Sequence, residues 1–224
     1  MKKATVYISE EIDKAVAEEL SKDTRVVFLK PYPALPARLA SHADMLLATS
    51  DDAAFCFEGY RLDGDLVRIK TVPGEIYPDD VPLNCTFMGS RLIANPKTVS
   101  PEIIEYSKRN DITVIEVKQG YAGCAVCKVD DGALITADGG IASAASKAGI
   151  DVLEISPGGI YLPGYDQGFI GGASASLPDR IVFFGDVMLH PDGERIADFI
   201  GSHGKKCIFF PGIRLTDAGG ARLI

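Results

Sequence analysis

Apolar and polar positions along this chain alternate in blocks that are typical of short strands and short amphipathic helices. Four segments share one order of elements: a strand-sized apolar run, a polar stretch able to cap a helix, a helix-sized amphipathic run, and a second strand-sized run. The four segments span residues 5–29, 91–117, 133–155 and 181–210. This recurrence predicts an α/β fold that is built from one repeated unit.

Two of the predicted helices carry clear start signals. Ser100 is the expected N-cap of a helix over residues 101–109, with Pro101 at the first helical position and Glu102 in the first turn. Asp192 is the expected N-cap of the last helix. These signals favour a helix, rather than a further strand, between the two apolar runs of each unit.

An additional strand is predicted before three of these segments. Residues 85–94, 125–136 and 173–184 each have two apolar runs joined by a short polar turn, which is typical of a hairpin. The first segment has no such strand before it, whereas the chain ends in an apolar run at 221–224 with no partner downstream. We expect this run to pair antiparallel with residues 5–9, because the pairing removes two exposed sheet edges.

A fifth unit is incomplete. It begins with the apolar run 44–49, but residues 51–81 hold only short apolar runs among Asp, Gly and Pro, with no clear helix. The expected starts of the inner strands recur every 40 to 49 residues, at Asp44, Asn84, Cys124, Gly171 and Gly220. We therefore predict one domain over residues 1–224, a five-bladed α/β propeller of ββαβ units, one of them degenerate, closed by its terminal strands. A generic layered α/β sheet is the alternative.

Composition and charge narrow the class of protein. The chain has 224 residues, of which 46% are hydrophobic and 24% charged, as in a globular protein with a large core. The net charge of −8 disfavours nucleic acid as a partner, which would require a basic face. The apolar runs are too short for a signal peptide or a membrane span. Five cysteines in a chain of this size predict reduced thiols and a cytoplasmic location, rather than a disulfide framework.

The order of elements resembles the pentein, or guanidino-group-modifying enzyme, superfamily of five-bladed α/β propellers with a central active site. Residues 121–184 are the most similar, and 162–174 also resemble an uncharacterised bacterial family of this fold. Pentein hydrolases and amidinotransferases use a carboxylate, a His and a Cys at the starts of inner strands. Here the matching positions, 123–125, 168–172 and 219–222, lack the acid, the His and the Cys respectively. The resemblance therefore implies the fold, but not deiminase or amidinotransferase activity.

The starts of the inner strands are also the candidates for chemistry. The predicted register brings to the ring centre a set that includes His42, Asp44, Asn84, Cys85, Cys124, Ser174 and Arg222. In one interpretation Cys124 or Cys85 is a nucleophile with His42 as its base, which requires a nearby cation to lower the pKa of the thiol. In the other, both cysteines are small buried apolar residues and His42 lies at a strand end on the surface.

A ligand pocket is predicted at the same centre. Its expected border includes Tyr165 and Asp166 from a polar loop, and the backbone of Gly171 and Gly172, where glycine permits close approach. The remaining expected lining residues are Asn84 and Cys124, with Asp44 and Arg222 opposite them. A solid centre filled by side chains is the alternative.

Cys124 and Cys127 form a Cys-x-x-Cys motif, but it does not favour a metal or redox site. Zinc would need a second pair of ligands, and the three histidines lack paired spacing. Strand residues three positions apart also face opposite sides of a sheet. We predict no metal and no cofactor.

Two functions fit these observations. The first is the binding or conversion of a small polar molecule, such as an amine, a guanidine or an amino acid, with any catalysis being that of a Cys-dependent hydrolase or transferase. The second is a non-catalytic protein- or ribosome-binding module, because a ribosome anti-association factor of similar size has the same repeated fold. The missing triad favours the second function or a different chemistry.

Overall fold

The computed structural model describes residues 3–224 and contains five three-stranded sheets with one common strand order. In each sheet, the middle strand pairs parallel with the strand after it and antiparallel with a third strand, which precedes it in the chain in four sheets and is the last strand, β15, in the fifth. The sheets comprise β15 (Ala221–Leu223), β1 (Thr5–Ser9) and β2 (Arg25–Leu29); β3 (Leu47–Thr49), β4 (Ala54–Phe57) and β5 (Val67–Ile69); β6 (Thr86–Met88), β7 (Arg91–Ala94) and β8 (Thr113–Glu116); β9 (Cys127–Lys128), β10 (Ala133–Thr136) and β11 (Asp151–Glu154); and β12 (Ser174–Ser176), β13 (Arg180–Phe183) and β14 (Lys206–Ile208).

Helices connect the parallel strands in four of the five sheets, as is usual for a parallel crossover. These helices are α1 (Lys14–Ser21), α3 (Pro101–Arg109), α5 (Gly139–Lys147) and α6 (Gly193–Ser202). The crossover from β4 to β5 contains no helix within the described part of the chain, as expected for the incomplete unit. No helix among residues 3–224 is long and apolar enough to cross a membrane.

The two ends of the chain form one sheet, as predicted. Tyr7 of β1 lies opposite Arg222 of β15 in the antiparallel register. The backbone N–H groups of Thr5 and Ile224 each donate to the other residue's carbonyl at 2.8 Å. The first sheet is therefore assembled from the first and the last strands of the chain.

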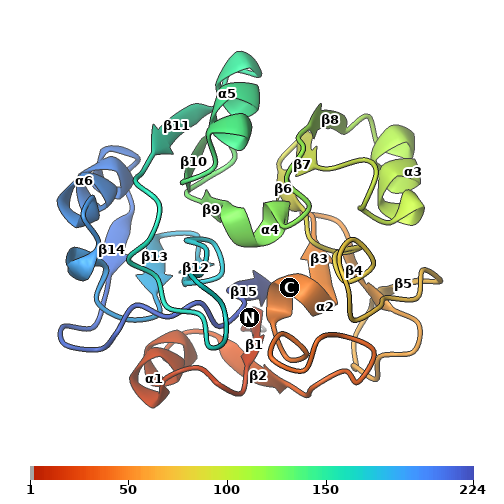
Figure 1. The fold of residues 1–224 in the computed structure, drawn as a ribbon, viewed down its shortest axis with the longest axis horizontal. Coiled ribbons are helices and arrows are strands. Elements are labelled where there is room, and N and C mark those ends of the chain that lie inside the picture. Colours follow the sequence, from red (N-terminus) through yellow and green to blue (C-terminus); the bar gives the residue numbers. More distant parts are fainter. Residues whose placement is uncertain (1–2) are drawn as a thin grey trace.

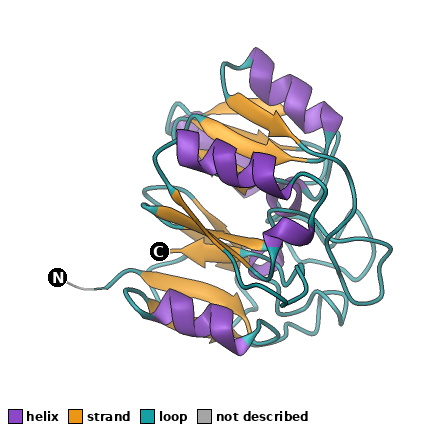
Figure 2. Ribbon diagram, turned by 90° about the vertical axis from the view of Figure 1, so that its left-hand side faces the viewer, coloured by secondary structure: helices purple, strands orange, loops and turns teal. Residues whose placement is uncertain are grey.

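The five sheets lie around a common centre, with β3, β6, β9, β12 and β15 innermost and α1, α3, α5 and α6 outside (Figure 1). Neighbouring inner strands contact one another from β9 through β12, β15 and β3 to β6. No strand pairing joins one sheet to another within residues 3–224. The long loops gather on one side and the C-terminus lies on the other (Figure 2). We call the side from which the inner strands start the loop face, and the side where they end the strand-end face.

The hydrophobic core is divided among the spaces between consecutive sheets. Val6 and Leu20 pack with Val182 between the first and the last sheet. Phe183 and Ile135 belong to a second cluster between two other sheets. Because aliphatic and aromatic side chains fill these spaces, the ring centre is left to smaller and more polar residues.

All five inner strands start one to three residues later than predicted, at Leu47, Thr86, Cys127, Ser174 and Ala221. Asp44 and Cys124, expected as first strand residues, lie instead in one-turn helices, α2 (Ala43–Leu46) and α4 (Ala122–Ala125), that precede β3 and β9. In α2, the N–H groups of the third and fourth residues bond to the carbonyl of His42. The backbone N–H groups thus find acceptors within one helical turn before the strand begins. An alternation of apolar and polar residues does not reveal such a turn.

Candidate functional site

Five polar side chains gather in a buried cluster at the start of the inner strands. They are His42, Asp44, Asn84, Cys124 and Asp217, which we call the polar centre, and all are at least 95% buried. They come from α2 and its N-cap, from the segment before β6, from α4 and from the segment before β15. The predicted convergence of His42, Asp44, Asn84 and Cys124 is thus present in the structure.

Asn84 holds the polar centre together through both ends of its amide. Its Oδ1 accepts hydrogen bonds from the N–H groups of Gly123 (2.7 Å) and Cys124 (3.0 Å). Its Nδ2 donates to the Cys124 thiol at 2.9 Å, to the Asp44 carbonyl at 3.2 Å and to the Met45 sulfur at 3.2 Å. The amide oxygen and the amide nitrogen of Asn84 are thus both hydrogen-bonded, and the side chain joins α2 to α4.

Asp44 is completely buried, and neither of its carboxylate oxygens has a hydrogen-bond partner among residues 3–224. The Cys124 thiol lies near enough for Asp44 to raise its pKa, but a thiol is a weak donor. Buried polar atoms in folded proteins are nearly always hydrogen-bonded, and an unpaired buried carboxylate is costly. Asp44 is therefore the residue of the polar centre whose hydrogen bonding is least satisfied.

Asp217 is the second buried carboxylate. Its oxygens accept hydrogen bonds from the N–H groups of Phe169 (2.8 Å) and Gly219 (3.0 Å), and His42 Nδ1 lies 4.0 Å from its Oδ1. Burial, reinforced by Asp44, raises the pKa of Asp217 to about 6, while His42 and the backbone donors oppose the shift. Two carboxylates and one imidazole thus share a space without bulk water.

Neither candidate nucleophile is activated in this arrangement. Burial raises the pKa of Cys124 well above its ordinary value, and Asp44 and Asp217 raise it further. Burial raises the pKa of Cys85 to about 12, although Arg222 acts in the opposite direction. A thiolate at Cys124 would need a cation where the structure has carboxylates.

The glycines in the loop before β12 permit close approach, as predicted. A Cβ on Gly171 would lie 2.3 Å from the Val126 carbonyl oxygen, and one on Gly172 would lie 2.0 Å from Asp217 Oδ1. The N–H of Gly172 donates to the Cys124 carbonyl at 3.0 Å. We predicted that backbone in this loop would bind a ligand, but the Gly172 N–H is already bonded within the protein.

Aromatic residues cover the polar centre on the loop face. The Tyr121 ring stacks between Tyr77 and Phe169, and its hydroxyl bonds to buried Asp80 at 2.5 Å. Burial, together with Asp80, Cys124 and Tyr165, raises the pKa of Tyr121, so these groups lie close to one another. Tyr165 itself is 45% exposed, and Asp166 is exposed in the same loop.

A cavity of about 420 Å³ opens at the ring centre on the strand-end face. Cys85, Gly171 and Arg222 line it, whereas Asp44, Asn84 and Cys124 do not. The single pocket predicted from the sequence is thus divided into a closed polar centre on one side and an open cavity on the other. Arg222 lies within β15, whereas Asp44 lies before the start of β3. Arg222 is therefore closer to the strand-end face, and Asp44 is closer to the loop face.

Three residues of the site are not among those predicted from the sequence: Asp217, Asp80 and Tyr121. Asp217 stands immediately before Ala-Gly-Gly and the last inner strand, a position equivalent to that of Asp44, and this was the available signal. Asp80 lies in the unit without a helix, where no pattern indicates its burial. Within residues 3–224, no three His, Cys, Asp or Glu side chains gather in a way that could hold a metal ion.

A family model, described as "Family of unknown function (DUF6873)", matches residues 7–221. The chain belongs to this family. No curated protein matches this DUF6873 chain.

Solved structures of similar fold include DDAH from Pseudomonas aeruginosa, a Cys-to-Ser mutant complexed with citrulline, with a TM-score of 0.61 at 9% identity over 100% of both chains. A dimethylarginine dimethylaminohydrolase adduct with 4-chloro-2-hydroxymethylpyridine gives 0.57 at 12% identity, over 94% of this chain and 92% of that one. C. jejuni agmatine deiminase gives 0.53 at 9%, over 93% and 87%. The DUF6873 chain therefore has the pentein fold that its sequence resembles.

Proposed function

We propose that this DUF6873 protein binds a small organic cation, an amine or a guanidine, at its polar centre. The observation that supports the proposal is Asp44, a fully buried carboxylate whose two oxygens have no hydrogen-bond donor among residues 3–224 other than the weakly donating Cys124 thiol nearby. In this proposal, residues 1–224 form one domain, a five-bladed α/β propeller closed by its terminal strands, and the ligand lies on the propeller axis.

The charge balance of the polar centre favours a cation over a neutral or anionic ligand. An unpaired buried carboxylate costs several kcal/mol. Asp217 adds a second acid, and His42 is the basic side chain beside it. A guanidinium or ammonium group would supply both the missing positive charge and the missing N–H donors for Asp44.

In this proposal, the ligand reaches the polar centre through the aromatic cover. Exposed Tyr165 lies near Asp80, which bonds to Tyr121, and Tyr121 in turn lies near Cys124. A cation that enters from the loop face would meet tyrosine rings, which attract cations, and the buried Asp80 before it reaches Asp44. Tyr165 and Asp166 then border the entrance rather than the binding position.

A thermal-shift assay with matched cationic and neutral compounds tests the proposal. L-Arginine and citrulline differ in side-chain charge, and agmatine and putrescine extend the cationic series. We expect at least one cation to raise the melting temperature of the parent protein, because a ligand that binds only the folded state stabilises it. Citrulline should give a smaller shift.

Asp44→Asn is the decisive variant, with exposed Asp52→Asn as its matched control. Asp44→Asn removes a buried charge, so the variant should fold and lose the cation-dependent shift, while Asp52→Asn retains it. The proposal is wrong if no cation stabilises the parent, or if Asp44→Asn responds as strongly as the parent.

A Cys-dependent hydrolase or transferase is the second candidate function. One observation favours it: Arg222 lies near Cys85 and acts to lower the pKa of that thiol. Peptide mapping after brief alkylation at pH 7.5 separates the two functions. In a pure binder, half-buried Cys207 should be alkylated before Cys85 and Cys124. Preferential labelling of Cys85 or Cys124 would support the enzyme.

A further inference from the structure

The cavity on the strand-end face contains an arginine that no carboxylate neutralises within residues 3–224. Arg222 Nε donates to the Leu47 carbonyl at 3.3 Å, and its Nη1 donates to the Ala221 carbonyl at 3.1 Å. Its Nη2 packs beside Gly123 and forms no hydrogen bond with any described residue. Arg222 is half-buried and forms no ion pair in the described part of the chain.

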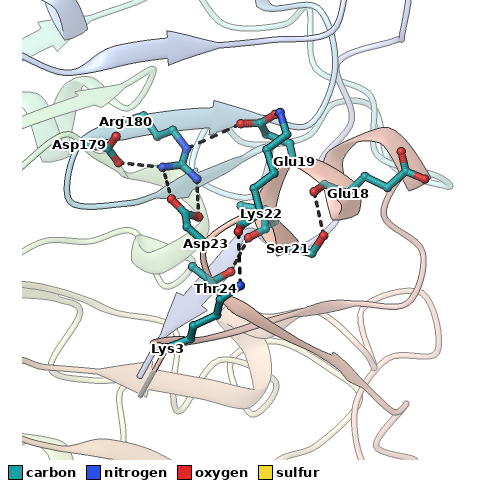
Figure 3. A network of polar contacts seen from close by, with 10 residues as sticks. Lys3, Glu18, Glu19, Ser21, Lys22, Asp23, Thr24, Asp179 and Arg180 are labelled. Atoms are coloured by element: carbon teal, nitrogen blue, oxygen red, sulfur yellow. Dashed lines mark hydrogen bonds and ion pairs between the residues drawn. The ribbon is translucent and has the colours of Figure 1, made fainter. Parts of the chain in front are cut away.

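Arg180 shows how the same protein treats a buried arginine that has only a structural role. Asp23 binds both of its terminal nitrogens, at 2.7 and 2.8 Å, and Asp179 binds one of them at 2.8 Å (Figure 3). Glu19 lies 3.9 Å from its Nε. Three carboxylates therefore surround Arg180, whereas Arg222 has carbonyl oxygens alone and faces an open cavity.

The other charges around the cavity limit the kind of anion it can take. Two further cations, Lys128 and Lys205, line it, but so do three acids, Asp51, Asp130 and Asp131. Lys128 is paired with Asp131 at 2.7 Å, and Lys205 donates to the Leu177 carbonyl at 2.8 Å. Cations and acids balance, so the cavity is unsuited to a polyanion such as nucleic acid.

The remaining walls are apolar in part. Phe87, Val126 and Leu177 line the cavity beside the hydroxyl groups of Thr86 and Ser174. A volume of about 420 Å³ fits a small molecule, and sites of that kind combine apolar walls with a few polar groups. The planar guanidinium of Arg222 has one nitrogen, Nη2, without a hydrogen-bond partner among the described residues, and its fork geometry suits a carboxylate.

We propose that this cavity binds the carboxylate of a small organic acid with an apolar body, and that Arg222 is its counter-ion. The site is separate from the polar centre, because none of the five polar-centre residues lines it. The inference does not rest on the proposed cation site and can hold if that site fails.

Isothermal titration of the full chain with sodium benzoate tests this inference. Benzamide is the neutral isostere, and inorganic phosphate is the competing anion. We expect benzoate to bind the parent with a stoichiometry of one and to bind more tightly than benzamide or phosphate. Arg222→Gln should weaken benzoate binding at least tenfold, while exposed Arg61→Gln should leave it unchanged.

Further variants keep the test informative. If Arg222→Gln does not fold, as judged by circular dichroism, Arg222→Lys retains the charge but loses the planar fork, and it should also weaken binding. Asp44→Asn should bind benzoate as the parent does. The inference is overturned if benzoate does not bind, if folded Arg222 variants bind it unchanged, or if phosphate binds more tightly.

Discussion

The Asn84 side chain donates to the Cys124 thiol at 2.9 Å and accepts from the Cys124 backbone N–H at 3.0 Å, so one amide holds α4 by both its backbone and its side chain. The same amide donates to the carbonyl of Asp44. Asn84 comes from the segment before β6, and it therefore ties three of the five units together at their common centre.

Asn84→Ala should consequently destabilise the protein far more than its size implies. The change leaves the N–H groups of Gly123 and Cys124 buried without acceptors, and each such loss costs about 1–3 kcal/mol. We expect a total loss of about 3 kcal/mol or more in urea unfolding. Exposed Asn110→Ala, which removes one surface hydrogen bond, should cost less than about 1 kcal/mol. Equal effects of the two substitutions would contradict the role assigned to Asn84.

The raised pKa of Asp217 predicts an unusual dependence of stability on pH. Its pKa is about 6 in the folded protein and 3.8 in the unfolded reference, so the folded state binds more protons between these values. The stability contributed by this group is full below pH 3.8 and is lost as pH rises through 6. The shift corresponds to about 3 kcal/mol.

Asp217→Asn isolates that contribution from the other titrating groups. The free energy of unfolding is measured in urea for parent and variant from pH 4 to pH 7. Relative to the variant, the parent should lose about 2.4 kcal/mol over this range, because a small part of the contribution is already lost at pH 4. Glu102, whose pKa hydrogen bonds lower to about 2 despite the opposing desolvation, is unchanged in both proteins and cancels. Parallel pH profiles would show that Asp217 ionises freely.

Sequence patterning predicted the sheets well because each unit has a strict order of apolar runs. It identified the pairing of the two chain ends, since an unpaired strand at each end has one obvious partner. It could not assign Asp44 and Arg222 to different faces. That distinction depends on the one-turn helix α2, which is too short to produce a recognisable spacing of apolar residues in the sequence. Asp217 was not predicted because Asp in the stretch Asp-Ala-Gly-Gly is also typical of a plain turn.

Gly172→Ala should be severely destabilising, because the new methyl group would lie 2.0 Å from Asp217 Oδ1 and 2.4 Å from its Cγ. The carboxylate or the loop must move, and overpacking of this kind costs about 1–3 kcal/mol. Gly201→Ala is the matched control, since it lies in α6 and a methyl group there would have nothing within 4 Å among the described residues. That change should stabilise the protein slightly, by about 0.5 kcal/mol. A neutral Gly172→Ala would show that the loop before β12 is not packed against Asp217.

Deletion of residues 220–224 should cost much more stability than the loss of a free tail. The deletion removes β15, leaves β1 with one unpaired edge and exposes Val6 and Ile8, which are completely buried in the intact chain. Burial of one such side chain is worth about 1.5–3 kcal/mol, so the melting temperature should fall by many degrees. Leu223→Ala, which keeps the backbone pairing and trims one half-buried side chain, should cause a much smaller decrease. If the truncated protein melts at the same temperature as the parent, the terminal strands do not close the fold.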